Sequence, residues 1–308
     1  MGPPLAYLIV IAVWATTPLA IKLSSEYYAP MAAASLRFLL ACAIACCLIA
    51  LFRGGSSLKR THWKAYLVAS LGIFPNMPLV YMATGYISSG LVSVMMATAP
   101  FIMGALSIFV LRQNPFTPLR MLGLVVALAG LLVITANQFA LDADAWRGIL
   151  LMLGSTFTFS LSNVLLKRMD TSTIDPLEQS LGAMIFALPG LLLCWQVSDG
   201  NVPQIALNSA TWAVVYLAVV ASIVGFMAFY YVLRTLPFEL VGLVPLITPA
   251  LAMTLGVLYA GEMVDDALKL GSLMILLGLA IYEVVPGLLK RRRMSVVVSG
   301  CAGTAQHQ

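Results

Sequence analysis

Long apolar stretches separated by short polar segments dominate the pattern of this chain. A helix needs about 20 apolar residues to cross the roughly 30 Å hydrocarbon core of a bilayer. The runs are continuous rather than alternating, so they indicate helices and not the strands of a barrel. We therefore predict an all-α integral membrane protein with ten transmembrane helices. The windows cover residues 5–23, 30–52, 65–85, 89–111, 119–136, 147–166, 177–197, 211–233, 239–260 and 268–289.

The segments between these windows carry the charges and the turn-forming residues, as in SSEYYAP, RGGSSLKRTHWK and VSDGNVPQ. The link between the third and fourth windows, GYISSG, has no charge, and its glycines and serines mark it as a turn. The chain begins MGPPLAYLIV, without positive charges ahead of its first apolar stretch. We therefore interpret that stretch as a retained span and not a cleaved signal peptide.

Composition agrees with a lipid environment. Hydrophobic residues make up 61% of the chain and charged residues 9%, whereas an ordinary soluble domain has about 25% charged residues. The five cysteines form neither a CxxC pair nor a cluster with histidine. They are typical of small buried hydrophobic residues, so we predict no metal site and no cofactor.

The distribution of lysine and arginine predicts the orientation. With the N-terminus in the cytoplasm, the inside segments carry thirteen of these residues and the outside segments carry three. Because cytoplasmic loops are enriched in lysine and arginine, we predict that both termini are cytoplasmic. The net charge of +5 is then mostly a topology signal, and it does not indicate a nucleic-acid partner.

Two halves of the chain share an ordered series of matches. Tyr81–Pro100 aligns with Tyr230–Pro249 without a gap, and later Gly123–Gly130 aligns with Gly271–Gly278. Five spans in each half is an odd number, so the second half would be inverted relative to the first. We predict two five-helix repeats, residues 1–140 and 141–290, followed by a basic and then disordered cytoplasmic tail, residues 291–308.

Pro100 and Pro249 match each other in this alignment, and each lies about midway along its apolar window. Proline removes a backbone hydrogen bond and weakens a helix interior by about 3 kcal/mol. We interpret both prolines as hinges beside a polar cavity, where freed carbonyl groups meet water or substrate. The alternative is a kink that only improves packing, because proline is common in membrane helices.

The pattern resembles the EamA-type carriers of the drug/metabolite transporter superfamily over roughly residues 5–289. The motifs that carry the resemblance are Trp14 and Pro18, Pro30 with Arg37-Phe38, the prolines of TAP and TPA, and Gly261-Glu262 followed by Gly271 and Gly278. The first half has Arg112-Gln113 where the family has Gly-Glu. The resemblance implies ten helices, a central cavity lined by spans 1, 3, 4, 6, 8 and 9, alternating access, and traffic of small metabolites, often export.

Arg37 lies inside the second window, where a charged side chain is costly and often marks function. Its guanidinium would attract an anionic substrate by bidentate contact. The alternative is a structural arginine that reaches the interface or pairs with carbonyl groups.

Other polar and aromatic residues inside the windows are candidates to line a solute cavity. Such cavities combine apolar walls with a few convergent polar groups. The same side chains could instead join helices or bond their own backbone. The predicted substrate-binding residues, besides Arg37, are Trp14, Thr17, Asn76, Tyr81, Thr98, Asn163, Tyr230 and Thr248.

Two further features concern coupling and assembly. Glu283 lies near the end of its window and both histidines lie outside the windows, so we expect a facilitator or exchanger, or coupling by the solute's own charge.

Gly123, Gly130, Gly271 and Gly278 lie two turns apart on helix faces. They predict close helix packing or a subunit contact, and the second interpretation allows a homodimer.

The chain has no HExxH, GxSxG or P-loop motif and no paired carboxylates within a window, so we do not expect an enzyme. We predict a secondary transporter in the cell inner (plasma) membrane, with a small-molecule substrate and lipid as its surroundings. It would move small organic metabolites, such as amino acids or related solutes, in the export direction by alternating access. The alternatives are a multidrug or lipid-type exporter or flippase, and a channel-like facilitator.

Overall fold

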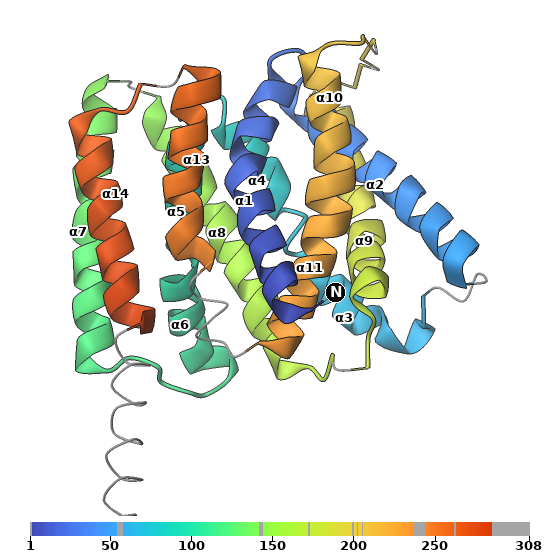
Figure 1. Cartoon of the computed structure of the whole chain (residues 1–308), viewed down its shortest axis with the longest axis horizontal. Helices are drawn as coiled ribbons and strands as arrows, with labels where there is room; N and C mark the ends of the chain where they lie inside the picture. Colours follow the sequence, from blue (N-terminus) through green and yellow to red (C-terminus); the bar gives the residue numbers. More distant parts are fainter. Residues whose placement is uncertain are drawn as a thin grey trace, which may run out of the picture.

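The computed structural model describes residues 2–53, 58–141, 144–171, 173–198, 200–201, 203–204, 206–236, 244–261 and 263–284, and these residues form helices without any strand (Figure 1). The first predicted half contains α1 (Pro3–Ser25), α2 (Pro30–Arg53), η1 (Arg60–His62), α3 (Trp63–Ser70), α4 (Asn76–Ala83), α5 (Ser89–Met96), α6 (Ala99–Val110) and α7 (Pro118–Leu141). The second contains α8 (Ala145–Arg168), α9 (Pro176–Ser198), α10 (Ser209–Tyr216), η2 (Leu217–Gly225), α11 (Phe226–Thr235), α13 (Val244–Ala260), α14 (Asp266–Leu279) and η3 (Ala280–Val284).

Six helical segments are long and apolar enough to cross a bilayer, which makes this chain a multi-pass membrane protein. They are Pro3–Ser25, Pro30–Leu51, Ser89–Val110, Ala145–Arg168, Pro176–Ser198 and Ser209–Thr235. Two shorter apolar helices, Pro118–Ile134 and Ile247–Tyr259, accompany them. The all-α prediction is therefore confirmed for the described residues, whereas ten crossings stay a prediction. Glu262 and the tail 291–308 lie outside the described residues.

Two of the predicted spans are interrupted. Residues 65–85 form α3 and α4 with a non-helical link at 71–75, and residues 89–111 form α5 and α6 with a break at Ala97 and Thr98. Pro75 directly precedes α4, and Pro100 is in the first turn of α6. Proline fits these positions because a first-turn residue has no intrahelical partner for its N–H.

Pro249 has a different setting from Pro100. It lies inside α13, which is an unbroken helix from Val244 to Ala260. Membrane helices tolerate an internal proline where neighbouring groups satisfy the freed carbonyl. The two prolines that match in the sequence alignment are therefore not equivalent in the structure: one starts a helix after a break, and the other lies within a helix.

The main helix contacts cross between the two predicted halves. The helix α7 lies along α14 at one edge of the bundle (Figure 1). Likewise α3 and α2 pack on α9, α4 and α6 pack on α8, and α1 packs on α13. Because most helices of one half are buried against the other, the two halves interlock and do not form separate bundles.

Glycines allow α7 and α14 to approach with backbones almost in contact. A Cβ atom at Gly123 would lie 2.5 Å from the Gly278 carbonyl oxygen, and one at Gly130 would lie 2.5 Å from the Gly271 carbonyl oxygen. These glycines therefore form a helix contact within one chain, which is the first of the two interpretations that the sequence allowed. The homodimer stays a prediction.

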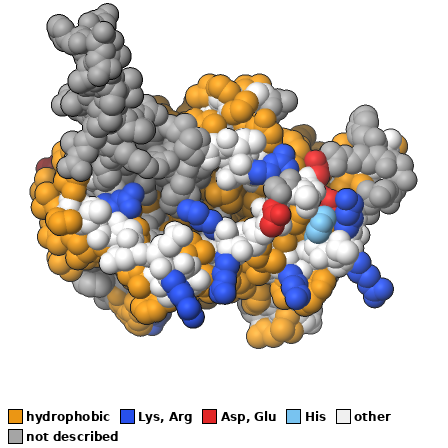
Figure 2. Space-filling model, turned by 90° about the horizontal axis from the view of Figure 1, so that it is seen from below, with side chains coloured by type: hydrophobic (Ala, Val, Ile, Leu, Met, Phe, Trp, Pro, Cys, Tyr) orange, Lys and Arg blue, Asp and Glu red, His pale blue; other side chains and the backbone are white. Residues whose placement is uncertain are grey.

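Lysine and arginine side chains gather at one end of the bundle. Figure 2 views the molecule from below the orientation of Figure 1, and blue side chains are distributed across this face between apolar flanks. The first helix, α1, begins on this side of the bundle (Figure 1). We call this surface the basic face. Its assignment to the cytoplasm stays a prediction from the positive-inside rule.

We expect Gly130→Ala to lower the stability of the protein although alanine favours helices by about 1 kcal/mol. The new methyl group would meet the Gly271 carbonyl oxygen at 2.5 Å and Met274 Cβ at 2.7 Å, and a backbone oxygen cannot rotate away. Overpacking of this kind costs about 1–3 kcal/mol. Thermal unfolding of purified protein in detergent would measure the change.

Gly154→Ala is the matched control, because its Cβ would have only Leu79 Cδ1 nearby, at an ordinary 3.4 Å. It should melt at or above the wild-type temperature. If Gly130→Ala also did so, α7 and α14 would not be in the close contact described here.

Candidate functional site

A small central cavity lies among the interrupted helices. It has a volume of about 80 Å³ and is mainly apolar. Of the predicted site residues, Trp14, Thr17, Arg37 and Thr248 line it. The other lining residues are Pro18, Ile21, Met77, Val80, Val92, Ser93, Met96, Phe159, Ala221 and Phe226. These residues come from predicted spans 1, 3, 4, 6, 8 and 9, as the family resemblance implies, with Arg37 added from α2.

Arg37 is buried at this cavity with 2% of its surface exposed. Its Nε donates a hydrogen bond to Ser222 Oγ at 2.9 Å, one terminal nitrogen lies 3.9 Å from Met77 Sδ, and the guanidinium lies 4.8 Å from the centroid of the Phe38 ring. Within the described part of the chain no carboxylate pairs with it. Its burial argues against an arginine that extends to the interface, and its partners leave the positive charge uncompensated.

The π-helix η2 positions the partner of Arg37. Ser222 donates its own hydroxyl proton to the Leu217 carbonyl five residues earlier, at 2.9 Å, so its oxygen is oriented to accept from Arg37. Single π-helical turns occur frequently at functional sites. Sequence reasoning missed Ser222, although it is the one hydroxyl residue in the apolar run LAVVASIVG.

Tyr81 is buried beside the central cavity and does not line it. Its side chain is 0% exposed and lies next to Arg37 and the Ser24 hydroxyl. Its own hydroxyl has no hydrogen bond of regular geometry to the described residues. Tyr81 therefore lies next to Arg37 but is not one of the residues that line the central cavity.

Three other predicted site residues use their polar atoms in hydrogen bonds within the protein, and only one of them, Asn76, joins two helices. Asn76 donates to the Gly72 carbonyl at 2.7 Å and accepts from Ser155 Oγ at 2.5 Å, which joins α4 to α8. Asn163 donates to the Phe159 carbonyl at 2.9 Å, and Thr98 donates to the Met95 carbonyl at 2.7 Å. None of the three lines the central cavity.

Three aromatic rings form a layer on one side of the central cavity. Trp14 lies 5.8 Å from Phe159 and 4.9 Å from Phe229 between ring centroids, and Phe159 and Phe229 are 6.0 Å apart. Trp14 and Phe159 also line the central cavity. Phe229 contacts Tyr230, at 5.7 Å, and Tyr230 lines a second pocket. We call these three rings the aromatic layer, and it connects residues that line the central cavity to Tyr230 of the second pocket.

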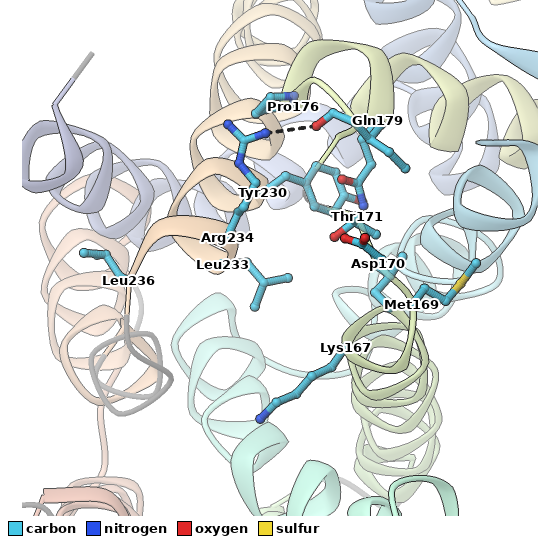
Figure 3. Close-up of a pocket in the computed structure, with 12 residues that line it drawn as sticks. Lys167, Met169, Asp170, Thr171, Pro176, Gln179, Tyr230, Leu233, Arg234 and Leu236 are labelled. Carbon is cyan, nitrogen blue, oxygen red and sulfur yellow. Dashed lines mark hydrogen bonds between the residues drawn. The ribbon is translucent and has the colours of Figure 1, made fainter. Parts of the chain in front are cut away.

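The second pocket, which we call the vestibule, has a volume of about 370 Å³. Its walls come from the C-terminal end of α8, the start of α9 and the end of α11 (Figure 3). Its lining residues are Leu166, Lys167, Met169, Asp170, Thr171, Ile174, Pro176, Gln179, Tyr230, Leu233, Arg234 and Leu236. Arg234 donates to the Ile174 carbonyl at 3.1 Å. Tyr230 is thus a predicted site residue that belongs to the vestibule and not to the central cavity.

Hydrogen bonds hold the opposite end of the bundle together. Tyr28, in the turn after α1, and Thr211, in the first turn of α10, share a hydrogen bond of 2.5 Å at the end away from the vestibule. Thr16, midway along α1, and Tyr216, the last residue of α10, share another of 2.5 Å. Both contacts tie the first predicted half to the second.

A buried carboxylate near the vestibule was not predicted from the sequence. Glu178, 7% exposed in the first turn of α9, accepts hydrogen bonds from the Lys59 backbone at 3.3 Å, from His62 Nδ1 at 3.1 Å and from the Tyr66 hydroxyl. These bonds join α9 to η1 and α3. Among the described residues no group of three His, Cys, Asp or Glu is placed to hold a metal ion.

Comparison with known proteins identifies the family. A model of the EamA-like transporter family matches residues 3–136 and 146–283. An uncharacterised transporter of Archaeoglobus fulgidus is 27% identical over 88% of this chain and 94% of its own length. The inner membrane transporter YedA of Escherichia coli K12 is 25% identical over 81% of this chain and 80% of its own.

A relative from Salmonella typhimurium, named a probable amino-acid metabolite efflux pump, is 25% identical over 89% of this chain and 92% of its own length. A solved crystal structure with 20% identity superposes with a TM-score of 0.68, over 92% of this chain and 98% of that one, and shares the fold. The family match spans both predicted halves, and these named relatives are transporters. This chain therefore belongs to the EamA-like transporter family.

Proposed function

We propose that the protein is a secondary transporter that exports small organic metabolites bearing a carboxylate, such as amino acids or related solutes, across the inner membrane. The observation that carries this proposal is the uncompensated charge of Arg37 at the central cavity. Ser222 carries no charge and accepts from only one N–H group of the guanidinium, so the other N–H groups stay available to an anion. A carboxylate would pair with them by bidentate contact.

The helix contacts support alternating access by two inverted halves. An exchange of the two halves replaces α1 by α8, α2 by α9, and the later helices in the same order. It turns the α1–α13 contact into the α8–α6 contact, and the α2–η2 contact into the α9–α3 contact. A pseudo-two-fold axis would generate this exchange. In our proposal residues 1–140 and 141–290 are the two repeats, with both termini in the cytoplasm.

The different structures of the two ends of the bundle support a conformation that is open toward the basic face. The vestibule lies at that end, while the Tyr28–Thr211 bond holds the other end and the Thr16–Tyr216 bond joins α1 to α10 midway along α1. Transport would break those bonds and close the vestibule. Loading from the basic face, predicted to be cytoplasmic, agrees with export and with the name of the Salmonella relative.

Coupling in this proposal depends on the charge of the solute. Within the described residues no carboxylate pairs with Arg37, so the central cavity has no acidic group beside its cation. The buried Glu178 lies in the first turn of α9 and accepts a hydrogen bond from Tyr66 of α3, and it does not line that cavity. A carrier of this kind works as a facilitator or an exchanger.

One observation favours a lipid-type exporter as the second candidate. An apolar groove of about 430 Å³ lies between α6, α7 and α8. Thr98 is its one hydroxyl residue, and its other lining residues are Phe101, Ile102, Ala105, Leu106, Phe109, Phe116, Leu124, Ala127, Leu128, Leu131, Leu153 and Phe157. An acyl chain would suit this lining, whereas a free amino acid would not.

The direct test of the main proposal uses proteoliposomes. Candidate solutes would come from a comparison of metabolites inside and outside cells with and without the protein. We expect saturable counterflow of a carboxylate-bearing solute, because a carrier exchanges solute against its gradient and a channel does not. Movement of labelled phospholipid without counterflow of any such solute would favour the lipid-type exporter.

We expect Arg37→Met to abolish counterflow while leaving the protein as stable as the wild type or more so. The substitution removes a buried cation that has no acidic partner, and Ser222 keeps its bond to Leu217. Arg37→Lys keeps the charge but loses the planar fork, so we expect at least tenfold weaker transport. Counterflow and thermal unfolding of the same preparations measure both effects. Normal transport by Arg37→Met would contradict the role of this residue.

We expect Asn76→Ala and Ser155→Ala to act through stability. Each removes the hydrogen bond between α4 and α8, at a cost of about 1 kcal/mol, and the double variant should lose less than the sum. Transport per folded molecule should then stay at the wild-type level in both. Loss of transport in Asn76→Ala alone, at unchanged stability, would instead make Asn76 a substrate contact, as the sequence predicted.

A further inference from the structure

The buried side chain of Arg37 meets only neutral groups. They are the Ser222 hydroxyl at 2.9 Å, the Met77 sulfur at 3.9 Å and the centroid of the Phe38 ring at 4.8 Å. Within the described residues no carboxylate forms an ion pair with it. Buried charges in proteins are paired or bind an ion, because an isolated charge in an apolar environment is very costly. The positive charge of Arg37 therefore needs a counter-charge that these residues do not supply.

A second polar group beside Arg37 also has incomplete pairing. The Tyr81 hydroxyl is one of two buried side-chain polar atoms that form no regular hydrogen bond among the described residues, and Tyr81 lies next to Arg37. The great majority of buried polar groups in proteins are hydrogen-bonded. An unpartnered hydroxyl next to an unpaired cation shows that the protein does not complete this polar cluster by itself. Because Tyr81 does not line the central cavity, Arg37 is the group that determines where a counter-charge would bind.

The size of the central cavity limits what can bind to Arg37 in this conformation. Small-molecule sites usually enclose about 300–1,000 Å³. The central cavity, at about 80 Å³, has room only for a few water molecules. A monatomic anion is close to a water molecule in size, so it fits this space, whereas an organic metabolite would require the cavity to widen.

The lining of the cavity suits a weakly hydrated anion. Arg37 is its cation, and the described lining residues include no aspartate or glutamate. Thr17, Ser93 and Thr248 add hydroxyl groups, which can donate hydrogen bonds, and the remaining walls are mainly apolar. An anion that enters such a cavity loses most of its water. Chloride and bromide release water more easily than sulfate or fluoride, so the lining favours these two ions.

We propose that the central cavity is a chloride site, in which the Arg37 guanidinium binds one chloride ion whenever no solute carboxylate is bound. The site rests on the buried, unpaired charge of Arg37 and the size of the cavity, whereas displacement of chloride by a carboxylate rests on the proposed function. Both anions use the same N–H groups of Arg37, so they compete. Chloride thus balances the charge of Arg37 in this narrow conformation, and the solute replaces it when the cavity widens.

Thermal unfolding of the full chain in detergent tests this site, with sodium chloride replacing sodium sulfate at constant ionic strength. A ligand that binds only the folded state raises the unfolding temperature. We expect chloride to raise that of the wild type by about 2–4 °C relative to Arg37→Met, which lacks the cation. General salt effects act on both proteins alike, so the difference between them reports the site.

Arg147→Met is the matched control. Arg147 has a side chain that is 50% exposed in the first turn of α8, where it pairs with Asp144, and it does not line the central cavity. The substitution removes the same charge from the surface of the protein. Its unfolding temperature should therefore respond to chloride as that of the wild type does.

A second measurement uses the wild type alone, so it holds even if Arg37→Met fails to fold. Crystals of the full chain grown in sodium bromide allow the anion to be located by its anomalous scattering. We expect an anomalous peak in the central cavity, in contact with the Arg37 guanidinium. Absence of a peak at Arg37, while bromide appears elsewhere on the protein, would overturn the site.

The outcomes separate this site from the proposed function. Equal responses to chloride in the wild type, Arg147→Met and Arg37→Met would overturn the chloride site, even if counterflow of a solute were observed. A response that only Arg37→Met loses, without counterflow by the wild type, would support the site and contradict the transporter. Where both are observed, chloride should raise the apparent KM for the solute and leave the maximal rate unchanged, and a KM that does not depend on chloride would overturn the competition.

Discussion

The hydrogen bond between Arg37 and Ser222 is the interaction on which the chemistry of the central cavity depends. A guanidinium inside a membrane helix costs about 2.5–3.5 kcal/mol on insertion scales, so it persists only where other helices receive it. Here a π-helical segment of the second predicted half supplies the receiving oxygen. The bond links α2 to η2, and it places a positive charge where helices from both halves meet.

Much of this arrangement could be predicted from the sequence because bilayer physics leaves few choices. The apolar windows predicted helices, and a helix break directly precedes α6, which holds Pro100, although the role of Pro100 as a hinge stays a prediction. The paired glycines predicted the close approach of α7 and α14. Trp14, Thr17, Arg37 and Thr248 were named as candidates from residue type and position alone, and they line one cavity.

The remaining features depend on contacts that no local pattern encodes. Glu178 looks like an ordinary first-turn acid in the sequence, and only the packing of α3 brings Tyr66 and His62 to it. Asn76 looks like a cavity residue until Ser155 is found opposite it. Gln179 and Tyr230 are 51 positions apart, and the vestibule forms only because α9 and α11 pack together. Residue type and position named these polar residues as candidates but could not say which of their polar atoms form hydrogen bonds in the fold.

The aromatic layer also bears on the energy balance of the cell. A membrane that maintains an ion gradient loses it through any continuous file of water, because protons and small cations follow such a file. Trp14, Phe159 and Phe229 pack ring against ring beside the central cavity, and Phe229 contacts Tyr230 of the vestibule. A passage lined in this way interrupts the file whenever no solute is crossing, so a cell could produce many copies of the protein without discharging its membrane potential.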